Sequence, residues 1–398
     1  MSAAELLASL LAEDVDAARS RADRVFDDVG TGRPVVLVGA GNLGKRAAAA
    51  MRAGGDIPTV FADRDSRRAG QLVDGVPVMT LADATARHAD AVFVVTIWGA
   101  HSHHRIAATQ RELADLGVTR MAPCAHLFWK YRAGLPHYLL DLPHHVLEHS
   151  AEVTRALALF GEETSRTEFV AQVRARLTGE VHNLGEPVAL PQYLADDLIA
   201  WREDESVVDG GAFAGDTLTS WIAHRGTVFS AWHAFEPQPD NAEVFARTVL
   251  SLPQDIRDRV TLYPVALGTQ HGRTAFSAAG GADANASATG ALTVDVAALD
   301  ELRLTPPPSF VKLDIEGAEI DALAGMRETV RRHRPVLAVC VYHRQDHMWR
   351  VPLAIASVCD GYDFFLRPHG AEGWDLVCYA VPVERRVRTM PMSGVHAQ

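Results

Sequence analysis

An acidic residue and a group of glycines open the part of this sequence that is best suited to chemistry. Asp209 follows the apolar residues 207–208 and precedes a glycine-rich turn over residues 210–215. Glycines let a ligand approach the backbone because no Cβ intrudes. Glu236 ends the next apolar run, 21 residues after Gly215 (236 − 215), where a carboxylate can accept both hydroxyl protons of a ribose. The pattern predicts a nucleoside site at the carboxyl ends of two neighbouring strands.

The spacing of the glycines narrows the class of ligand. The turn reads G-G-x-x-x-G instead of the G-x-G-x-x-G that cradles a pyrophosphate, so it favours a nucleoside without phosphates, such as S-adenosylmethionine. A third segment, residues 310–319, places Lys312, Asp314 and Glu316 around the end of a later strand, above the same crevice. Three strand ends therefore contribute to one predicted site.

Taken together, these segments resemble the FkbM family of S-adenosylmethionine-dependent methyltransferases. The resemblance covers roughly residues 185–383, and the order of its short motifs argues against chance agreement. The matching segments are 207–212, 235–237, 266–268, 311–319, 341–343, 366–369 and 378–380, together with Asp346.

The resemblance implies a cofactor, its binding residues and a substrate class. The cofactor is S-adenosylmethionine, with its methionine part on the glycine turn, its ribose on Glu236 and its adenine near Ser287. The reaction is methylation of a hydroxyl group on a small metabolite, such as a sugar, a nucleotide-sugar or a natural-product scaffold. The cofactor-binding residues carried over are Asp209, Gly210, Gly211, Ala212, Phe213, Gly215, Glu236, Pro237, Asp295 and Asp314.

Methyl transfer from a sulfonium needs alignment of the reactants and a base for the hydroxyl proton. Our candidates for the catalytic residues are Asp314, Glu316 and His343, and for substrate contact Lys312, His343 and His369. A divalent cation could also lower the proton affinity of the hydroxyl, held by Asp314 and Glu316 with His343 or His369. The alternative is that the carboxylates cap loops and the histidines pack beneath them.

A second glycine motif lies near the amino terminus. Residues 39–44 satisfy G-x-G-x-x-G between an apolar run and an Ala-rich helix, and Asp63 follows 19 residues after the last glycine (63 − 44). This context predicts a site for NAD(P) or a nucleotide-sugar, with the diphosphate at the helix amino terminus. The alternative is a degenerate unit that keeps its glycines for packing. The residues predicted for this site are Gly39, Gly41, Asn42, Leu43, Gly44 and Asp63, while His101, His103 and His104 either face the same crevice or lie on a solvated loop.

Apolar runs that alternate with helical patterns predict an α/β protein of two tandem Rossmann-like domains, the second with a class I methyltransferase fold. We expect a nucleotide-binding domain over 1–140 that begins with a helix to about residue 30, a helical connector over 141–185 and the methyltransferase domain over 186–398. The small-residue segment 277–290 is predicted to be a mobile lid. The expected strands are 34–38, 59–62, 91–96, 206–209, 231–236, 260–267, 310–314, 336–341, 363–367 and 376–381.

Composition limits the partners. The chain has 398 residues, and 38 Lys and Arg against 50 Asp and Glu give a net charge of −12, which disfavours nucleic acid or an anionic membrane and favours a small-molecule substrate. The four cysteines form no C-x-x-C pair, as is typical of a reducing cytoplasm. No apolar run reaches the roughly 18 residues of a membrane helix, and no signal peptide is expected. A homodimer is compatible with these features.

The sequence therefore predicts a cytoplasmic S-adenosylmethionine-dependent O-methyltransferase of the kind used in natural-product biosynthesis. Two alternatives rest on the first glycine motif. One is an NAD(P)-dependent oxidoreductase, and the other is a nucleotide-sensing protein whose methyltransferase fold has lost its activity.

Overall fold

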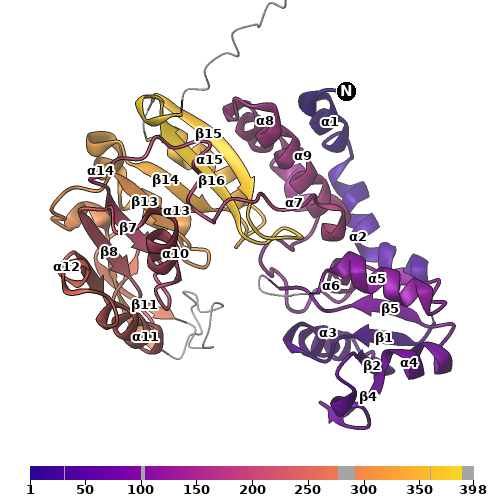
Figure 1. Cartoon of the computed structure of the whole chain (residues 1–398). Helices are drawn as coiled ribbons and strands as arrows, with labels where there is room; N and C mark the ends of the chain where they lie inside the picture. The colour runs from indigo at the N-terminus through magenta and orange to yellow at the C-terminus, as the bar shows by residue number, and fades with distance from the viewer. Residues whose placement is uncertain (31, 100–103, 277–291, 359, 388–398) are drawn as a thin grey trace, which may run out of the picture.

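Two mainly parallel β-sheets joined by helices make up the computed structural model, which describes residues 1–30, 32–99, 104–276, 292–358 and 360–387. Figure 1 shows the two sheets on opposite sides of the molecule, with the helices of the connecting region at the top between them. The predicted lid over 277–290, Ser287, His101 and His103 lie outside the described residues.

The amino-terminal sheet has six strands in the order β3-β4-β2-β1-β5-β6, and all neighbouring pairs except β3–β4 are parallel. Every residue of β1 and β5 is buried, which explains why both read as continuous apolar runs. The strands are β1 (Val35–Val38), β2 (Val60–Asp63), β3 (Leu72–Val73), β4 (Val76–Thr80), β5 (Val92–Val95) and β6 (Met121–Ala122).

Helices surround this sheet and extend it toward the amino terminus. The single helix expected over residues 1 to about 30 is instead two helices, because the chain turns at 11–14 and the Asp14 carboxylate accepts the backbone N–H groups of Asp16 and Ala17 at the start of the second. The helices are α1 (Ala3–Leu10), α2 (Val15–Gly30), α3 (Asn42–Ala53), α4 (Leu81–Arg87), α5 (Ile106–Asp115) and α6 (Cys124–Tyr131).

Three helices connect the two sheets: α7 (His144–Glu148), α8 (Ser150–Leu159) and α9 (Glu163–Thr178). They belong to the packing of both halves, because α9 contacts α1 while α8 contacts α15 (His347–Ala356). A single β-bridge also joins Phe160 to Phe364 on the edge of the second sheet. The connector is therefore a packed layer between the two sheets.

The carboxyl-terminal sheet has seven strands in the order β15-β16-β14-β13-β7-β8-β9. The pairs from β14 to β9 are parallel, whereas β16 runs antiparallel to both β14 and β15, so the predicted terminal strand pair is confirmed. The strands are β7 (Ser206–Gly210), β8 (Ala231–Phe235), β9 (Val260–Tyr263), β13 (Phe310–Leu313), β14 (Val336–Cys340), β15 (Tyr362–Pro368) and β16 (Leu376–Pro382).

The prediction of one strand over 260–267 is wrong. Pro264 has no N–H to continue the pairing, and the chain turns there with the Val265 N–H donating to the Tyr263 carbonyl. The remainder becomes β10 (Ala266–Leu267), which joins β11 (Gly272–Phe276) and β12 (Leu292–Ala297) in a separate three-stranded sheet. The other helices of this half are α10 (Asp216–Arg225), α11 (Pro239–Leu250), α12 (Gln254–Arg257), α13 (Glu319–Ala324) and α14 (Arg327–His333).

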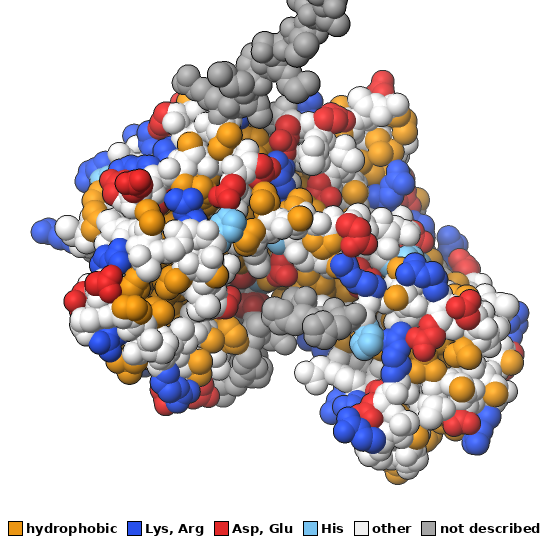
Figure 2. All heavy atoms as spheres, viewed as in Figure 1, with side chains coloured by type: hydrophobic (Ala, Val, Ile, Leu, Met, Phe, Trp, Pro, Cys, Tyr) orange, Lys and Arg blue, Asp and Glu red, His pale blue; other side chains and the backbone are white. Residues whose placement is uncertain are grey.

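The surface carries charges of both signs. On the face drawn in Figure 2, Lys and Arg side chains lie among Asp and Glu side chains over both halves of the molecule. In the described part of the chain, no helix has the length and apolar character needed to cross a membrane.

Candidate active site

The carboxyl ends of β7, β8 and β13, which are neighbours in the sheet, meet at one edge. Backbone hydrogen bonds tie the loops after these strands together: the Gly211 N–H donates to the Phe235 carbonyl over 2.9 Å, and the Asp314 N–H to the Gly210 carbonyl over 3.1 Å. In an open parallel sheet, ligands bind outside such strand ends. The three segments singled out from the sequence therefore do come together.

Gly211 allows two of these loops to touch. Its φ is +77°, and a Cβ built on it would lie 1.9 Å from the carbonyl oxygen of Asp314. Only glycine fits such a left-handed position under a neighbouring backbone. The space next to Gly211 is thus filled by the protein itself, so this glycine serves loop packing, whereas the sequence alone suggested the approach of a ligand.

Asp209 and Lys312 form a buried ion pair beneath the site. The Lys312 ammonium lies 3.0 Å from Asp209 Oδ1 and donates to the Gly211 carbonyl over 2.6 Å, and both side chains are at least 98% buried. Burial raises the pKa of Asp209, and the facing carboxylates raise the pKa of Lys312 against the effect of burial. Because both charges are buried, any effect on a bound ligand is indirect, through the turn that this pair holds.

Glu236 follows β8 and has the geometry of a ligand-binding carboxylate. It is 5% exposed, with Oε2 accepting the Phe213 N–H and Oε1 accepting the Gln238 N–H, each over 2.9 Å. Phe213 has a left-handed φ of +44°, so Glu236 helps to hold a strained turn. Burial raises the pKa of Glu236 despite the two amide donors. The Asn241 side chain is a third donor to this carboxylate, which leaves about one of its four lone-pair sites open.

Asp314 lies directly after β13 and accepts from several side chains. Oδ2 accepts from the Tyr193 hydroxyl over 2.7 Å, and Oδ1 lies 3.1 Å from His343 Nε2 and 3.5 Å from the Tyr342 hydroxyl. Burial alone would raise its pKa, but His343, Lys312 and Tyr193 outweigh burial and hold the pKa of Asp314 well below its usual range. The side chain is still 25% exposed, so an ionised carboxylate reaches the surface at this edge of the sheet.

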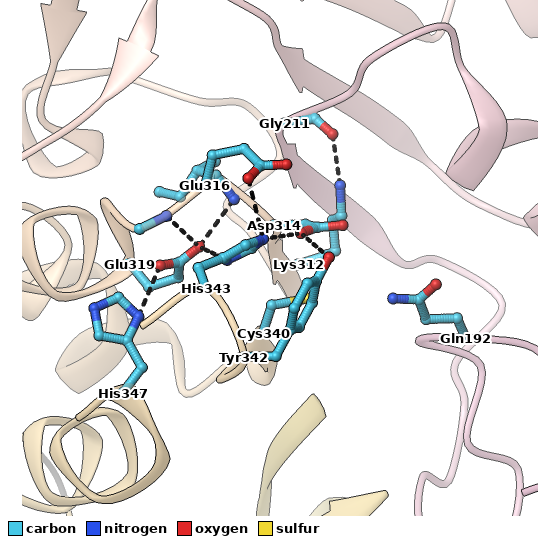
Figure 3. A network of polar contacts seen from close by, with 12 residues as sticks. Gln192, Gly211, Lys312, Asp314, Glu316, Glu319, Cys340, Tyr342, His343 and His347 are labelled. Atoms are coloured by element: carbon cyan, nitrogen blue, oxygen red, sulfur yellow. Dashed lines mark hydrogen bonds and ion pairs between the residues drawn. The ribbon is translucent and has the colours of Figure 1, made fainter. Parts of the chain in front are cut away.

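A row of alternating charges continues below Asp314. Figure 3 shows the His343 ring between the carboxylates of Asp314 and Glu319, with His347 beyond them. His343 Nδ1 lies 2.8 Å from Glu319 Oε1, and His347 Nδ1 lies 3.0 Å from Glu319 Oε2. The carboxylates overcome burial and raise the pKa of His343, while the two histidines lower the pKa of Glu319 against the same penalty.

This environment argues against His343 as the base. With a carboxylate at each ring nitrogen and a raised pKa, its favoured form is the imidazolium, which has no lone pair to accept a proton. A metal on Asp314, Glu316 and His343 would have to displace the His343 proton, since a ligating imidazole is neutral, and stays a prediction. Among the described residues, the set of three potential ligand atoms within 4.8 Å of one another is on His144, His145 and Glu148 instead.

Several predicted residues lie in or around the site without an obvious chemical role. Glu316, with a left-handed φ of +55°, places Oε2 3.7 Å from His343 Nε2 and is 17% exposed. Gly215 is the residue before α10, Ala212 is fully buried, and Pro237 follows Glu236. Their parts in cofactor binding stay predictions.

Two predicted residues are engaged elsewhere. Asp295 on β12 is exposed and pairs with Arg273 of the adjacent strand over 3.3 Å. His369 places Nε2 2.7 Å from the Tyr379 hydroxyl and Nδ1 3.2 Å from the Leu190 carbonyl, and burial lowers its pKa to about 4. Neither side chain has a described polar contact with Glu236 or Asp314, so the structure gives no support for their predicted roles.

Sequence reasoning missed Tyr193 and Glu319. Glu319 is the last residue of the segment 310–319, but its sequence context does not distinguish it from a solvent-exposed acid at the start of a helix. Tyr193 lies 121 residues before Asp314 (314 − 193), in a segment with no glycine or charge pattern. Both are identified only by long-range contacts.

The amino-terminal motif forms a glycine turn between β1 and α3. Gly39 has φ of +109°, and a Cβ on Gly44 would lie 2.0 Å from the Gly39 carbonyl, whereas a Cβ on Gly41 would meet nothing within 4 Å. Asn42 and Leu43 begin α3, so Gly41 precedes its amino terminus. Asp63 is engaged internally: it accepts the Ala40 N–H over 3.0 Å and lies 3.3 Å from Arg68. His104 is exposed and lies between β5 and α5, outside the glycine turn.

The mixed seven-stranded sheet, with ligand-type residues at its carboxyl edge, is consistent with a methyltransferase fold. Comparison with protein families gives the same class: residues 209–367 match the family model described as the methyltransferase FkbM domain. This range runs from the end of β7 into β15. Residues 209–367 are thus similar to FkbM methyltransferase domains, the family that the sequence resembles.

A solved structure supports the fold over nearly the whole chain. The crystal structure of a methyltransferase FkbM from Methylobacillus flagellatus has a TM-score of 0.75 and 19% identity, covering 94% of this chain and 97% of that one. A putative rRNA methylase from Clostridium thermocellum has a TM-score of only 0.29 and 14% identity, over 48% of this chain and 90% of that one. A search of the curated proteins gave no match.

Proposed function

We propose that this protein transfers a methyl group from S-adenosylmethionine to a hydroxyl of a small metabolite. The observation that carries the proposal is the pair of carboxylates at neighbouring strand ends, Glu236 after β8 and Asp314 after β13, on either side of the turn that follows β7. We assign the ribose to Glu236, and Asp314, whose side chain is 25% exposed, is an ionised acceptor.

The described residues fit this cofactor. A buried carboxylate that keeps an open acceptor position beside its amide donors, as Glu236 does, suits a hydroxyl donor of a ribose. The turn over 211–215 has the glycine spacing that favours a nucleoside over a dinucleotide. When bound, S-adenosylmethionine supplies a methyl group attached to a positively charged sulfur.

Asp314 is the group we assign to the acceptor proton. An oxygen that gains a methyl group while it still holds its proton becomes strongly acidic, so a carboxylate of low proton affinity is a sufficient base. His343, Tyr342 and Tyr193 hold the carboxylate in one orientation, and Lys312 keeps it ionised. Fixed donors and a fixed acceptor are the features that lower the barrier of an aligned displacement.

The test of the cofactor site is calorimetric titration with S-adenosylhomocysteine, the product of any such reaction. We expect wild type to bind, and Glu236→Gln to bind at least about tenfold more weakly, because a charged acceptor is replaced by a neutral amide. Glu243→Gln on α11, whose carboxylate is 69% exposed and pairs with Arg247, is the matched control. Equal affinity of Glu236→Gln and wild type would exclude this role for Glu236.

We also propose that the amino-terminal sheet is a Rossmann-like unit that binds a diphosphate nucleotide, such as NAD(P) or a nucleotide-sugar. The open space at Gly41, between two glycines that serve packing, supports the proposal. Gly41→Ala should preserve the melting temperature and weaken nucleotide binding, because its methyl group occupies the space a diphosphate needs. Gly161→Ala, also free of neighbours within 4 Å, is the control. Unchanged nucleotide affinity in Gly41→Ala would contradict the proposal.

A further inference from the structure

Tyr193 is held in a strained backbone conformation next to the site. Its φ is +69°, in the left-handed region that a bulky side chain rarely adopts, and its side chain is only 4% exposed. Such a conformation persists only where the surroundings determine it, and it is typical of functional sites. The segment around it follows the connector and leads into β7, outside the range matched by the methyltransferase model.

Contacts on every side fix this residue. The Tyr193 N–H donates to the Tyr379 hydroxyl over 3.0 Å, and the Lys312 ammonium lies 5.4 Å from the centre of its ring. The amide Nε2 of Gln192 donates to the Tyr193 oxygen over 2.8 Å, and Cys340 Sγ lies 3.4 Å away. Figure 3 shows Gln192 on the opposite side of the site from Glu319.

The proton of the Tyr193 hydroxyl points to Asp314. Because the amide nitrogen of Gln192 can only donate, the tyrosine oxygen accepts there and its own proton is free for Asp314 Oδ2, 2.7 Å away. The two oxygens of Asp314 then differ. Oδ1 faces both His343 and Tyr342, whereas Oδ2 accepts from Tyr193 alone among the described residues. An acceptor position therefore remains on Oδ2.

We propose that Tyr193 is a positioning residue, which fixes Asp314 so that Oδ2 is the oxygen that receives the proton of the methyl acceptor. This inference rests on the proposed function. Tyr193 donates its hydroxyl proton permanently to the carboxylate and takes no part in the transfer itself, because burial and the nearby Asp314 charge raise its pKa. The catalytic unit of this chain thus begins at the segment before β7.

The experiment uses Tyr193→Phe in the full-length chain, which keeps the ring and removes the hydroxyl. In crystals grown without cofactor, we expect the Asp314 carboxylate to leave its wild-type rotamer, while calorimetry with S-adenosylhomocysteine gives an affinity within about twofold of wild type. With an acceptor that supports turnover, kcat should fall about tenfold to a hundredfold at an unchanged KM for S-adenosylmethionine, the effect of losing a hydrogen bond to a charged group.

Tyr362→Phe is the matched control. It removes another buried tyrosine hydroxyl, which donates to the Pro335 carbonyl over 3.0 Å, and should leave Asp314 and kcat unchanged. If Tyr193→Phe does not fold, Gln192→Leu tests the same arrangement. It removes the donor to the Tyr193 oxygen, so the hydroxyl proton is no longer directed at Asp314. An Asp314 carboxylate that keeps its wild-type position in the folded variant overturns the proposal. Failure of wild type to bind S-adenosylhomocysteine would instead count against the proposed function, since the rotamer measurement needs no cofactor.

Discussion

Glu319 is the residue on which most of the charged groups beneath the site depend. Its carboxylate faces His343 and His347 and also accepts the backbone N–H groups of Ile315 and Gly317, over 3.0 and 3.4 Å. It is fully buried, so its charge is stable only because these partners replace water. Glu319 fixes both the loop after β13 and the His343 ring, and thereby helps to hold the Asp314 carboxylate in place.

Glu319→Gln should therefore destabilise the protein. Removing one partner of a buried pair leaves the other uncompensated, at a cost of about 3 kcal/mol in the free energy of unfolding. Urea unfolding measures this cost, with Glu328→Gln, whose exposed carboxylate pairs with Arg331, as the control. A loss no larger than that of the control would mean that Glu319 does not hold the site together.

The same substitution has a pH signature. The pKa of His343 is raised in the folded protein, so its contribution is complete below the unfolded value of about 6.5 and is lost as the pH rises through the folded value. The pKa of Glu319 is lowered, so its contribution is present above about pH 4.3 and is lost as the pH falls through the folded value. The difference in unfolding free energy between wild type and Glu319→Gln should thus be largest between about pH 4.3 and about pH 6.5 and shrink toward pH 9. A constant difference from pH 5 to pH 9 would contradict a charged His343.

At the scale of elements, the turn after β7 and the loop after β13 act as one unit because their backbones touch. The contact is at Gly211, whose Cβ would collide with the Asp314 carbonyl. The turn is the proposed cofactor site, whereas the loop carries Asp314, the proposed base. A change in one should therefore be felt in the other.

Gly211→Ala tests this coupling. The methyl group forces two backbones apart in a left-handed position, so we expect a loss of at least about 2 kcal/mol of stability together with loss of S-adenosylhomocysteine binding. Chemical unfolding and calorimetry measure the two effects. Gly272→Ala on β11, which has nothing within 4 Å and a φ open to any residue, should change neither. Normal binding by Gly211→Ala would show that the turn and the loop move independently.

The elements also show what the sequence could predict. Each residue of a strand such as β1 or β7 is buried, so the hydrophobic pattern alone located both strands, and parallel topology then brought Asp209, Glu236 and Asp314 to one edge. The hydrophobic pattern could not distinguish a carboxylate that reaches the surface at this edge from one that is buried beneath it. Asp209 and Asp314 both follow apolar residues, yet only Asp314 is exposed. Tyr193 could not be predicted as a site residue because no local sequence pattern encodes a contact across 121 residues.

At the scale of the whole molecule, the loop between β15 and β16 joins the two halves. Glu372 Oε1 accepts the Ile106 N–H at the start of α5 over 2.6 Å, and its carbonyl accepts from the Trp98 indole over 3.0 Å. Trp374, from the same loop, packs 4.7 Å from Trp98 between ring centres. Trp98 follows β5, next to the amino-terminal glycine motif. The carboxyl-terminal half therefore caps a helix of the amino-terminal half.

We expect Glu372→Ala to weaken the join between the halves. The first turn of α5 loses a buried acceptor and a negative charge at its amino terminus, which together stabilise a helix by about 1 to 2 kcal/mol. Scanning calorimetry should show a lower melting temperature, with the amino-terminal half unfolding ahead of the rest, because the Glu372 carboxylate is one of the groups that couple the halves. Glu186→Ala is the control: its carboxylate is 89% exposed and pairs with Arg105 just before α5, so its removal should have little effect. A single transition at the wild-type temperature in Glu372→Ala would mean that the aromatic contact between Trp98 and Trp374 is sufficient to couple the halves.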